Sequence, residues 1–249
     1  MLTILTVCTG NICRSPVAAL AMAAWMSDLR VDFASAGTRA RDGVGMTDEA
    51  VDLAEAFSVP RTVAKAHRSR LLTPAHLDNV DLVVAMTREH RRIVVEMDPS
   101  RLRVTFTARE LARMLDGLDD SVLAAAVRMP ASAPDPQRAR FSNIVDALRA
   151  RRGVTAPPVS PADDDVVDPF GRSVTTYRRS AAELNPGLAA VERLVRLSAS
   201  AAWSSHDRSL DHPGAGAHSR GTTHREAGRP PLSRRDRTSA ERESSDRSI

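Results

Sequence analysis

Short apolar runs alternate with amphipathic stretches along the first 115 residues of the chain. The apolar runs are rich in β-branched residues and have the length of buried strands. They occupy residues 2–7, 31–38, 81–86 and 102–106. Strands that alternate with helices indicate a parallel sheet covered on both faces. We therefore expect an α/β fold with a doubly wound, open parallel sheet of about four strands flanked by helices.

The amphipathic stretches are predicted to be helices. Several begin at a hydroxyl residue that can cap a helix, and Ser15 followed by Pro16 is such a start, because proline suits the first helical turn. The predicted helices cover residues 16–25, 47–59, 87–97, 107–115 and 173–197. Thr73 with Pro74 opens a further one.

Two regions depart from this alternation. Residues 116–162 contain helical pieces at 121–127 and 137–151, with proline-rich connections between and after them. We interpret this region as a helical insertion, or as an elaborated crossover, within a single domain of residues 1–199. From about residue 200 the composition shifts to Ser, Arg, Gly and His. Such a segment cannot bury enough apolar surface to fold alone, so residues 200–249 are predicted to be a disordered Arg/Ser-rich tail.

Composition narrows the class of protein. The chain has 249 residues, of which 42% are hydrophobic and only 3% aromatic, so the core must be aliphatic. Its 35 basic and 31 acidic residues give a net charge of +4, too small an excess to indicate nucleic-acid binding. No apolar stretch is long enough to span a membrane, and no basic leader precedes the first run. We expect a cytoplasmic protein with neither nucleic-acid nor membrane partners.

The loop between the first strand and the first helix carries the candidate chemistry. It begins at Cys8 and reaches Arg14 six positions later, a Cys-x5-Arg spacing. A helix N-terminus and successive loop amides suit a tetrahedral oxyanion, and a guanidinium can bind two of its oxygens. The same positive field favours a thiolate nucleophile. The alternative is an ordinary buried cysteine beside a surface arginine, but the full string at this position favours the functional interpretation.

A candidate general acid lies near the other end of the chain. Asp168 is followed by Pro169, which restricts the preceding residue to extended backbone and so stiffens the loop. The alternative is ordinary turn chemistry, since Asp-Pro also occurs at residues 98–99 and 135–136. The neighbouring acidic residues 163–165 are expected to form a solvated run.

Both features resemble those of one family. Residues 7–16, VCTGNICRSP, resemble the phosphate-binding loop of the low-molecular-weight protein tyrosine phosphatases. The sequence Asp168-Pro169-Phe170 matches the family's Asp-Pro-aromatic motif, which carries the general acid shortly before the C-terminal helix. The resemblance spans roughly residues 1–199.

The resemblance implies a role for each site residue. Cys8 would attack phosphorus, Arg14 would hold the oxygens and Asp168 would act as acid and then base, with no cofactor or metal. The residues implied to bind phosphate are Thr9, Gly10, Asn11, Ile12, Cys13, Arg14 and Ser15. The Ser15 hydroxyl would also donate to the Cys8 thiolate and ease its departure from phosphate. Ser35 and His67 resemble the family's residues that hydrogen-bond the loop Asn, which holds a left-handed conformation. The implied partners are phosphotyrosine proteins and a cognate tyrosine kinase of a bacterial cell, and the protein would be a monomer or weak dimer.

Departures from the family pattern concern specificity. Arg41 takes about the position of an aromatic residue found in several members, and Phe170 is followed by Gly171, so Arg41 and Phe170 are expected at the rim of the substrate slot. A branch that removes phosphate from arginine carries Thr where Ile12 stands, so Ile12 favours tyrosine.

Three questions stay open at this point. Arsenate reductases use the same loop, but they relay oxidation through further cysteines, and this chain has only Cys8 and Cys13. A phosphate-binding reader module is the alternative outside enzymology. Cys13 is interpreted either as a small space-filling residue or as the partner of Cys8 in a reversible disulfide.

Overall fold

A computed structural model describes residues 1–116, 118–127 and 133–200 of the chain. The tail predicted at residues 200–249 lies outside these residues, apart from Ser200. Within the described ranges, no helix is both long enough and apolar enough to cross a bilayer.

One parallel sheet organises the described residues. Its strands are β1 (Leu2–Cys8), β2 (Val31–Gly37), β3 (Leu82–Ala85) and β4 (Thr105–Thr107). They lie in the order β2-β1-β3-β4, and every neighbouring pair is parallel. This arrangement confirms the predicted fold class. The last strand is displaced from the predicted 102–106, because Asp98 caps a 3-10 turn over Pro99–Arg103 that takes up the first residues of that run.

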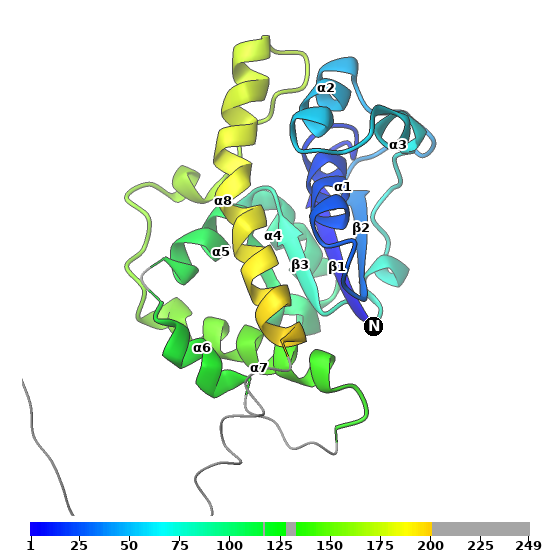
Figure 1. Ribbon diagram of the computed structural model, residues 1–249. Helices are drawn as coiled ribbons and strands as arrows, with labels where there is room; N and C mark the ends of the chain where they lie inside the picture. The colour runs from blue at the N-terminus through cyan, green and yellow to red at the C-terminus, as the bar shows by residue number, and fades with distance from the viewer. Residues whose placement is uncertain (117, 128–132, 201–249) are drawn as a thin grey trace, which may run out of the picture. The chain divides into compact units, whose positions relative to one another are not determined.

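Helices cover both faces of this sheet (Figure 1). They are α1 (Arg14–Trp25), α2 (Asp48–Ala56), α3 (Arg61–Ala66), α4 (Arg88–Met97), α5 (Ala108–Leu115), α6 (Asp120–Ala126), α7 (Pro136–Ala150) and α8 (Val174–Ala199). On one face, Ile4 of β1 joins a large hydrophobic cluster with residues of α1, α5 and α8. On the other, Leu5 and Val7 pack with Val94 of α4. Alternate residues of β1 therefore serve opposite layers, as a doubly wound sheet requires.

Side-chain caps fix most helix starts where the sequence predicted them. The hydroxyls of Thr47, Thr87, Thr107 and Ser173 each accept a backbone N–H three residues later. The prediction for Ser15 is wrong: α1 starts at Arg14, so Ser15 lies inside the helix and its hydroxyl faces Cys8 instead.

Two other helix predictions change. Thr73 with Pro74 opens only a short 3-10 helix, Pro74–Leu77. Helix α3 was not predicted at all.

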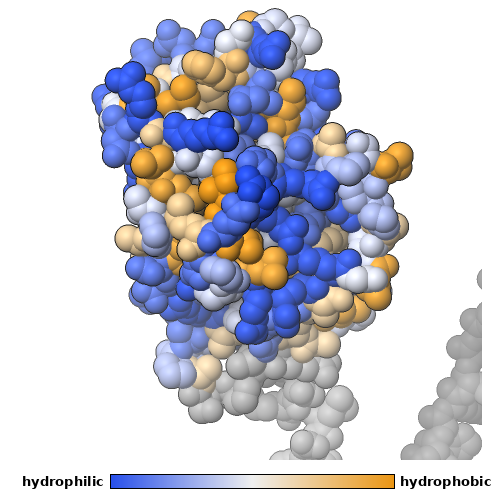
Figure 2. All heavy atoms as spheres, turned by 180° about the vertical axis from the view of Figure 1, so that it is seen from behind, coloured by the Kyte–Doolittle hydropathy of each residue, from blue (hydrophilic) through white to orange (hydrophobic). Residues whose placement is uncertain are grey.

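The region interpreted as an insertion belongs to the same core. Helix α7 buries Phe141, Ile144, Val145 and Leu148 in the cluster that also holds residues of α5 and α8. Figure 1 shows α6 and α7 at the end of the molecule where α8 finishes. The face seen in Figure 2, opposite to that view, is largely hydrophilic, and its hydrophobic residues form only small groups.

Candidate active site

The loop from Cys8 to Arg14 joins the carboxyl end of β1 to the start of α1. Because β1 is a central strand, the loop lies at the sheet edge where parallel α/β proteins bind ligands. It surrounds a pocket of about 170 Å³. The residues that line this pocket are Cys8, Thr9, Gly10, Ile12, Cys13, Arg14, Asp168 and Phe170.

The sulfur of Cys8 is buried and receives hydrogen bonds from the loop. The Asn11 amide N–H points at Cys8 Sγ from 3.3 Å, and Ser15 Oγ lies 3.0 Å from the same sulfur. Ser15 Oγ is also 3.3 Å from the Ala36 carbonyl, so its single hydrogen can go to either acceptor.

Asn11 does not line the pocket; its buried side chain holds the loop through hydrogen bonds to neighbouring elements. Its φ of 54° is left-handed, a conformation that Asn tolerates better than most residues. Its Nδ2 donates to Ser15 Oγ and Ser35 Oγ, both at 2.9 Å, and its Oδ1 accepts the Arg70 amide at 3.0 Å. His67 Nε2–H donates to the Asn11 carbonyl at 2.9 Å. The structure thus places Ser35 and His67 against Asn11, in the arrangement that the resemblance implied.

Gly37 at the end of β2 lets the loop approach closely. A Cβ at this position would lie 2.6 Å from the Thr9 carbonyl oxygen and 2.9 Å from the Asn11 amide nitrogen. Any side chain here would displace the loop backbone, so glycine is required at residue 37.

Arg14 and Asp168 meet at the pocket although 154 residues separate them in the sequence (168 − 14). Arg14 Nη2 lies 2.6 Å from Asp168 Oδ2; the arginine side chain is 4% exposed and that of the aspartate 51%. Arg14 Nη1 donates to the Val166 carbonyl at 3.1 Å, and the Phe170 amide donates to Asp168 Oδ1 at 3.2 Å. The carboxylate is therefore aimed at the pocket mouth by contacts on both sides.

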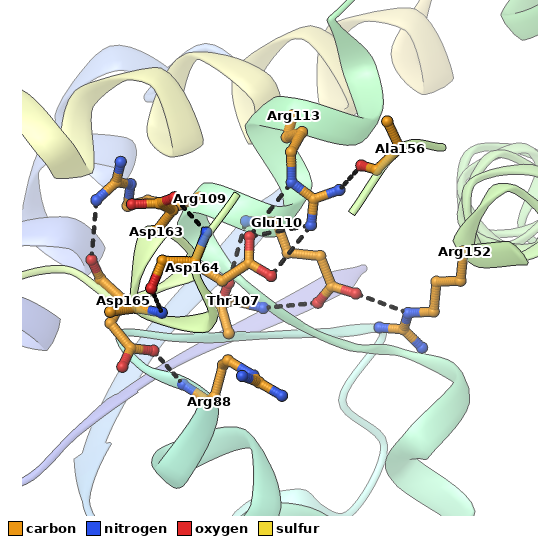
Figure 3. Close-up of polar contacts among 12 residues, drawn as sticks. Arg88, Thr107, Arg109, Glu110, Arg113, Arg152, Ala156, Asp163, Asp164 and Asp165 are labelled. Carbon is orange, nitrogen blue, oxygen red and sulfur yellow. Dashed lines mark hydrogen bonds and ion pairs between the residues drawn. The ribbon is translucent and has the colours of Figure 1, made fainter. Parts of the chain in front are cut away.

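The expected solvated run at residues 163–165 is found only in part: Asp163 is exposed, whereas Asp164 is buried and Asp165 half-buried. Asp164 is buried and forms an ion pair with Arg113 of α5, and Asp165 accepts the Arg88 amide at the start of α4 (Figure 3). Burial of the Asp164 carboxylate is possible because the guanidinium compensates its charge.

His90 is a site residue that the sequence did not reveal. One ring nitrogen, Nε2, lies 2.9 Å from Thr9 Oγ1, and Nδ1 lies 2.8 Å from Thr87 Oγ1. Arg14 Nη2 also donates to Thr9 Oγ1, at 3.4 Å. Burial, aided by the Arg14 charge, lowers the pKa of His90 to about 4, so the ring is neutral near pH 7. Its position three residues after a helix cap carries no sign of this contact.

Cys13 lies in an enclosed polar corner. Its Sγ is 3.6 Å from Thr47 Oγ1 and 3.7 Å from the hydroxyl of Tyr177 in α8. Burial raises the pKa of the Cys13 thiol and raises that of Tyr177 to about 12. Neither Thr47 nor Tyr177 was expected at the site. Both interpretations of Cys13 stay predictions.

The two residues expected at the rim differ in position. Phe170 lines the pocket and is 59% exposed, so its ring is accessible from solvent. Arg41 is exposed but does not line the pocket; its carbonyl accepts the Ser69 hydroxyl in a neighbouring loop.

The chain is similar in sequence to known phosphatases. The family described as "Low molecular weight phosphotyrosine protein phosphatase" matches residues 3–150. A protein-arginine-phosphatase of Geobacillus stearothermophilus is 38% identical over 114 residues, which are 46% of this chain and 74% of that protein. The low molecular weight protein-tyrosine-phosphatase Wzb of Escherichia coli (strain K12) is 33% identical over 96 residues, 39% of this chain and 62% of Wzb.

A solved structure extends the likeness to the fold. The crystal structure of a low molecular weight protein tyrosine phosphatase from T. tengcongensis superposes with a TM-score of 0.52 at 25% identity. The superposition covers 78% of this chain and 99% of that one.

Proposed function

The chain belongs to the low molecular weight phosphotyrosine protein phosphatase family, and we propose that it hydrolyses phosphotyrosine on proteins through a phosphocysteine intermediate. One observation carries the proposal: Cys8, Arg14 and Asp168 line a single pocket of about 170 Å³. That volume suits a phosphoryl group, and each of the three side chains has a distinct task there. The proposed partners are phosphotyrosine proteins and a cognate tyrosine kinase, in the cytoplasm.

In the first step the Cys8 thiolate attacks phosphorus. The S–P bond forms, the P–O bond to the tyrosine oxygen breaks, and Asp168 gives its proton to that oxygen as the phenol leaves. The Asn11 amide donates to Cys8 Sγ, and the Ser15 hydroxyl, 3.0 Å from that sulfur, turns its hydrogen to it once the thiolate forms; both stabilise the thiolate before the attack. In the second step Asp168 takes a proton from water, whose oxygen attacks phosphorus and releases phosphate and the thiolate.

In the transition state, negative charge is spread over the oxygens of the transferring phosphoryl group, and stabilising this charge is the main task of the site. Arg14 supplies a fixed guanidinium, held by Val166 and by Thr9. Its buried Nε has no hydrogen-bond partner among the described residues, which leaves one donor for a phosphate oxygen. Preorganised donors of this kind contribute most to phosphoryl transfer, and they require no metal.

Phosphoarginine is the second candidate substrate, because the chain is 38% identical to a protein-arginine-phosphatase. Against it stands Ile12 in the pocket wall, with the aromatic ring of Phe170 beside it. An apolar wall and a ring suit a flat phenyl group better than a charged guanidinium, which would lose hydration without gaining a polar partner. Tyrosine is therefore the preferred substrate.

The test compares wild type with Cys8→Ser and Asp168→Asn on p-nitrophenyl phosphate in the presence of a chelator. Cys8→Ser is expected to abolish turnover, and Asp168→Asn to lower it by roughly 10²-fold or more, as loss of a general acid does. A wild type that is inactive here but reduces arsenate with a thiol donor would instead be a reductase. A wild type that only binds phosphopeptides would be a reader module.

Substrate choice is tested with phosphotyrosine and phosphoarginine peptides of the same sequence. Wild type is expected to prefer phosphotyrosine, and Ile12→Thr to shift the ratio of kcat/KM values toward phosphoarginine. A wild type that prefers phosphoarginine at the outset would contradict the tyrosine assignment and leave the phosphocysteine chemistry intact.

A further inference from the structure

Two arginines of α5 fasten the segment that leads to Asp168: Arg109 Nη1 donates to the Asp165 carbonyl at 3.1 Å, and Arg113 pairs with Asp164. Arg113 Nη2 lies 3.0 Å from both oxygens of Asp164, and Arg113 Nε lies 3.3 Å from Oδ1 (Figure 3). The remaining nitrogen, Nη1, donates to the Ala156 carbonyl at 2.9 Å. A planar guanidinium that meets a carboxylate through its Nε/Nη2 edge fixes orientation as well as distance. The chain returns from the end of α7 to the pocket over residues 151–168, here called the return segment. Arg113 holds two of its residues, Ala156 and Asp164, against α5.

The three residues between this ion pair and Asp168 also form hydrogen bonds with the rest of the fold. Asp165 accepts the Arg88 amide at 2.7 Å. The Val166 amide donates to the Met86 carbonyl at 2.8 Å, and the Val167 amide donates to Glu183 at 2.8 Å. The path of the segment up to Asp168 is therefore set by a series of consecutive anchors, and the Arg113–Asp164 ion pair is the first of them.

Helix α5 is a rigid base for this ion pair. Its first turn is closed by a capping box in which Thr107 and Glu110 exchange hydrogen bonds. Glu110 is buried and also receives Arg152 Nε at 2.9 Å, from the end of the α7 segment. Glu110 and Arg113 lie one turn apart, so successive turns of α5 hold successive parts of the same return segment.

We propose that Arg113 is a positioning residue for the general acid: through Asp164 it sets where the Asp168 carboxyl lies over the pocket. This inference rests on the proposed function. A displacement of about 1 Å at a catalytic group can lower the rate by roughly 10²-fold. The competing view is that the ion pair only contributes to stability, and buried ion pairs often contribute little net stability.

The two views differ in how the rate depends on the leaving group. Phenoxide needs protonation as it departs, whereas p-nitrophenoxide leaves well without it, so a displaced acid lowers kcat/KM for phenyl phosphate more than for p-nitrophenyl phosphate. Partial unfolding lowers both values by the same factor. The ratio of the two values, measured on one enzyme sample, therefore isolates acid positioning from stability.

The experiment measures this ratio in the full chain for wild type, Arg113→Met, Arg113→Lys and Asp168→Asn. Arg113→Met is expected to lower kcat/KM for phenyl phosphate about tenfold more than for p-nitrophenyl phosphate. Arg113→Lys should recover part of the loss, because it keeps the charge without the planar fork. Arg92→Met, which removes an exposed arginine paired with Glu89 and Glu96, is the matched control and should leave the ratio unchanged.

A double variant completes the test. In an Asp168→Asn background, Arg113→Met should cause no further selective loss, since no acid remains to be positioned. Equal losses for both substrates in the single variant, or a persistent selective loss in the double variant, would overturn the inference. If Asp168→Asn itself shows no selective loss, the assignment of the general acid in the proposed function fails instead.

Discussion

His90 shows how a single residue can couple the site to pH. The ring is buried between the hydroxyls of Thr9 and Thr87 and lies within the field of the Arg14 guanidinium. Asp168 and Glu89 act in the opposite direction and Arg39 acts in the same direction as Arg14, and the net effect is a pKa of about 4 against an ordinary 6.5. A proton is therefore bound more readily by the unfolded chain than by the folded protein between these two values.

The first prediction is that this histidine lowers stability in mild acid. Because the unfolded state binds the proton first, the free energy of unfolding should fall as pH falls from about 6.5 to about 4, by roughly 3 kcal/mol. Above pH 6.5 the contribution should be constant. Urea unfolding of wild type and His90→Gln at pH 7 and pH 4.5 measures it: the loss between the two pH values should be smaller in the variant.

His67 does not affect the comparison between wild type and His90→Gln. Burial also lowers its pKa, but it is present in both proteins, so its contribution cancels in the difference. Identical pH dependence of wild type and His90→Gln would contradict the assignment of the effect to His90.

Residues of the site differ in how far the sequence can reveal them. Cys8 and Arg14 were predicted from one contiguous string, because the Cys-x5-Arg spacing suits a phosphate-binding loop. Asp168 was predicted because the proline that follows it restricts its backbone. His90 and Tyr177 contact the loop residues Thr9 and Cys13 only through tertiary packing, and Arg113 contacts Asp164 in the same way. Each lies on a helix whose local sequence gives no sign of the contact. The local pattern placed Ser15 at a helix cap, which is wrong, whereas the family resemblance implied a contact between its hydroxyl and Cys8, and the two atoms lie 3.0 Å apart.

At the scale of elements, the contact between α5 and α8 depends on one glycine. A Cβ on Gly187 in the middle of α8 would lie 2.6 Å from the Ala108 carbonyl oxygen and 2.8 Å from the Ala108 Cβ. Ala108 is the first residue of α5, the helix that carries Arg113. The two helices can lie this close only because residue 187 has no side chain.

The second prediction concerns this contact. On an exposed helix a Gly→Ala change would stabilise by about 1 kcal/mol, because it reduces the backbone entropy lost on folding. Gly187→Ala should instead lower the free energy of unfolding by about 1–3 kcal/mol, the range for overpacking a close contact. Gly153→Ala is the control, since a Cβ there meets nothing within 4 Å. Urea unfolding of wild type, Gly187→Ala and Gly153→Ala measures these free energies. A Gly187→Ala variant as stable as wild type would contradict the prediction.

Elements were predictable where local chemistry defines them. Thr47, Thr87, Thr107 and Ser173 cap their helices through side-chain contacts that span three residues, and such contacts are visible in sequence. Helix α3 was missed because its six residues, RTVAKA, bury only Ala64 and so show no periodicity. The start of β4 was misplaced because an Asp-capped 3-10 turn and a strand compete for the same apolar residues.

At the scale of the whole molecule, residues 136–150 are part of one hydrophobic core. Phe141, Ile144 and Leu148 of α7 are each 0% exposed, and they pack in the cluster that contains α1, α5 and α8 residues. The sequence predicted a helical piece here between proline-rich connections but could not say what it packs against, so the region was interpreted as an insertion. The packing makes it a contributor to the stability of the domain that holds the site.

The last prediction tests this integration. Phe141→Ala should lower the free energy of unfolding by about 3–5 kcal/mol, as loss of a fully buried ring does, whereas Ser142→Ala, at an exposed position on the same helix, should change it little.

A Trp203→Phe background makes Trp25 of α1 the only tryptophan. Because Trp25 packs against Phe57, far in sequence from α7, its fluorescence reports unfolding of another part of the core. If the core is one cooperative unit, Phe141→Ala should shift the Trp25 transition and the far-UV circular dichroism transition to the same lower urea concentration. A shift confined to the dichroism signal would mean that α7 unfolds separately, and its burial would then support only the local helix and not the pocket at the end of β1.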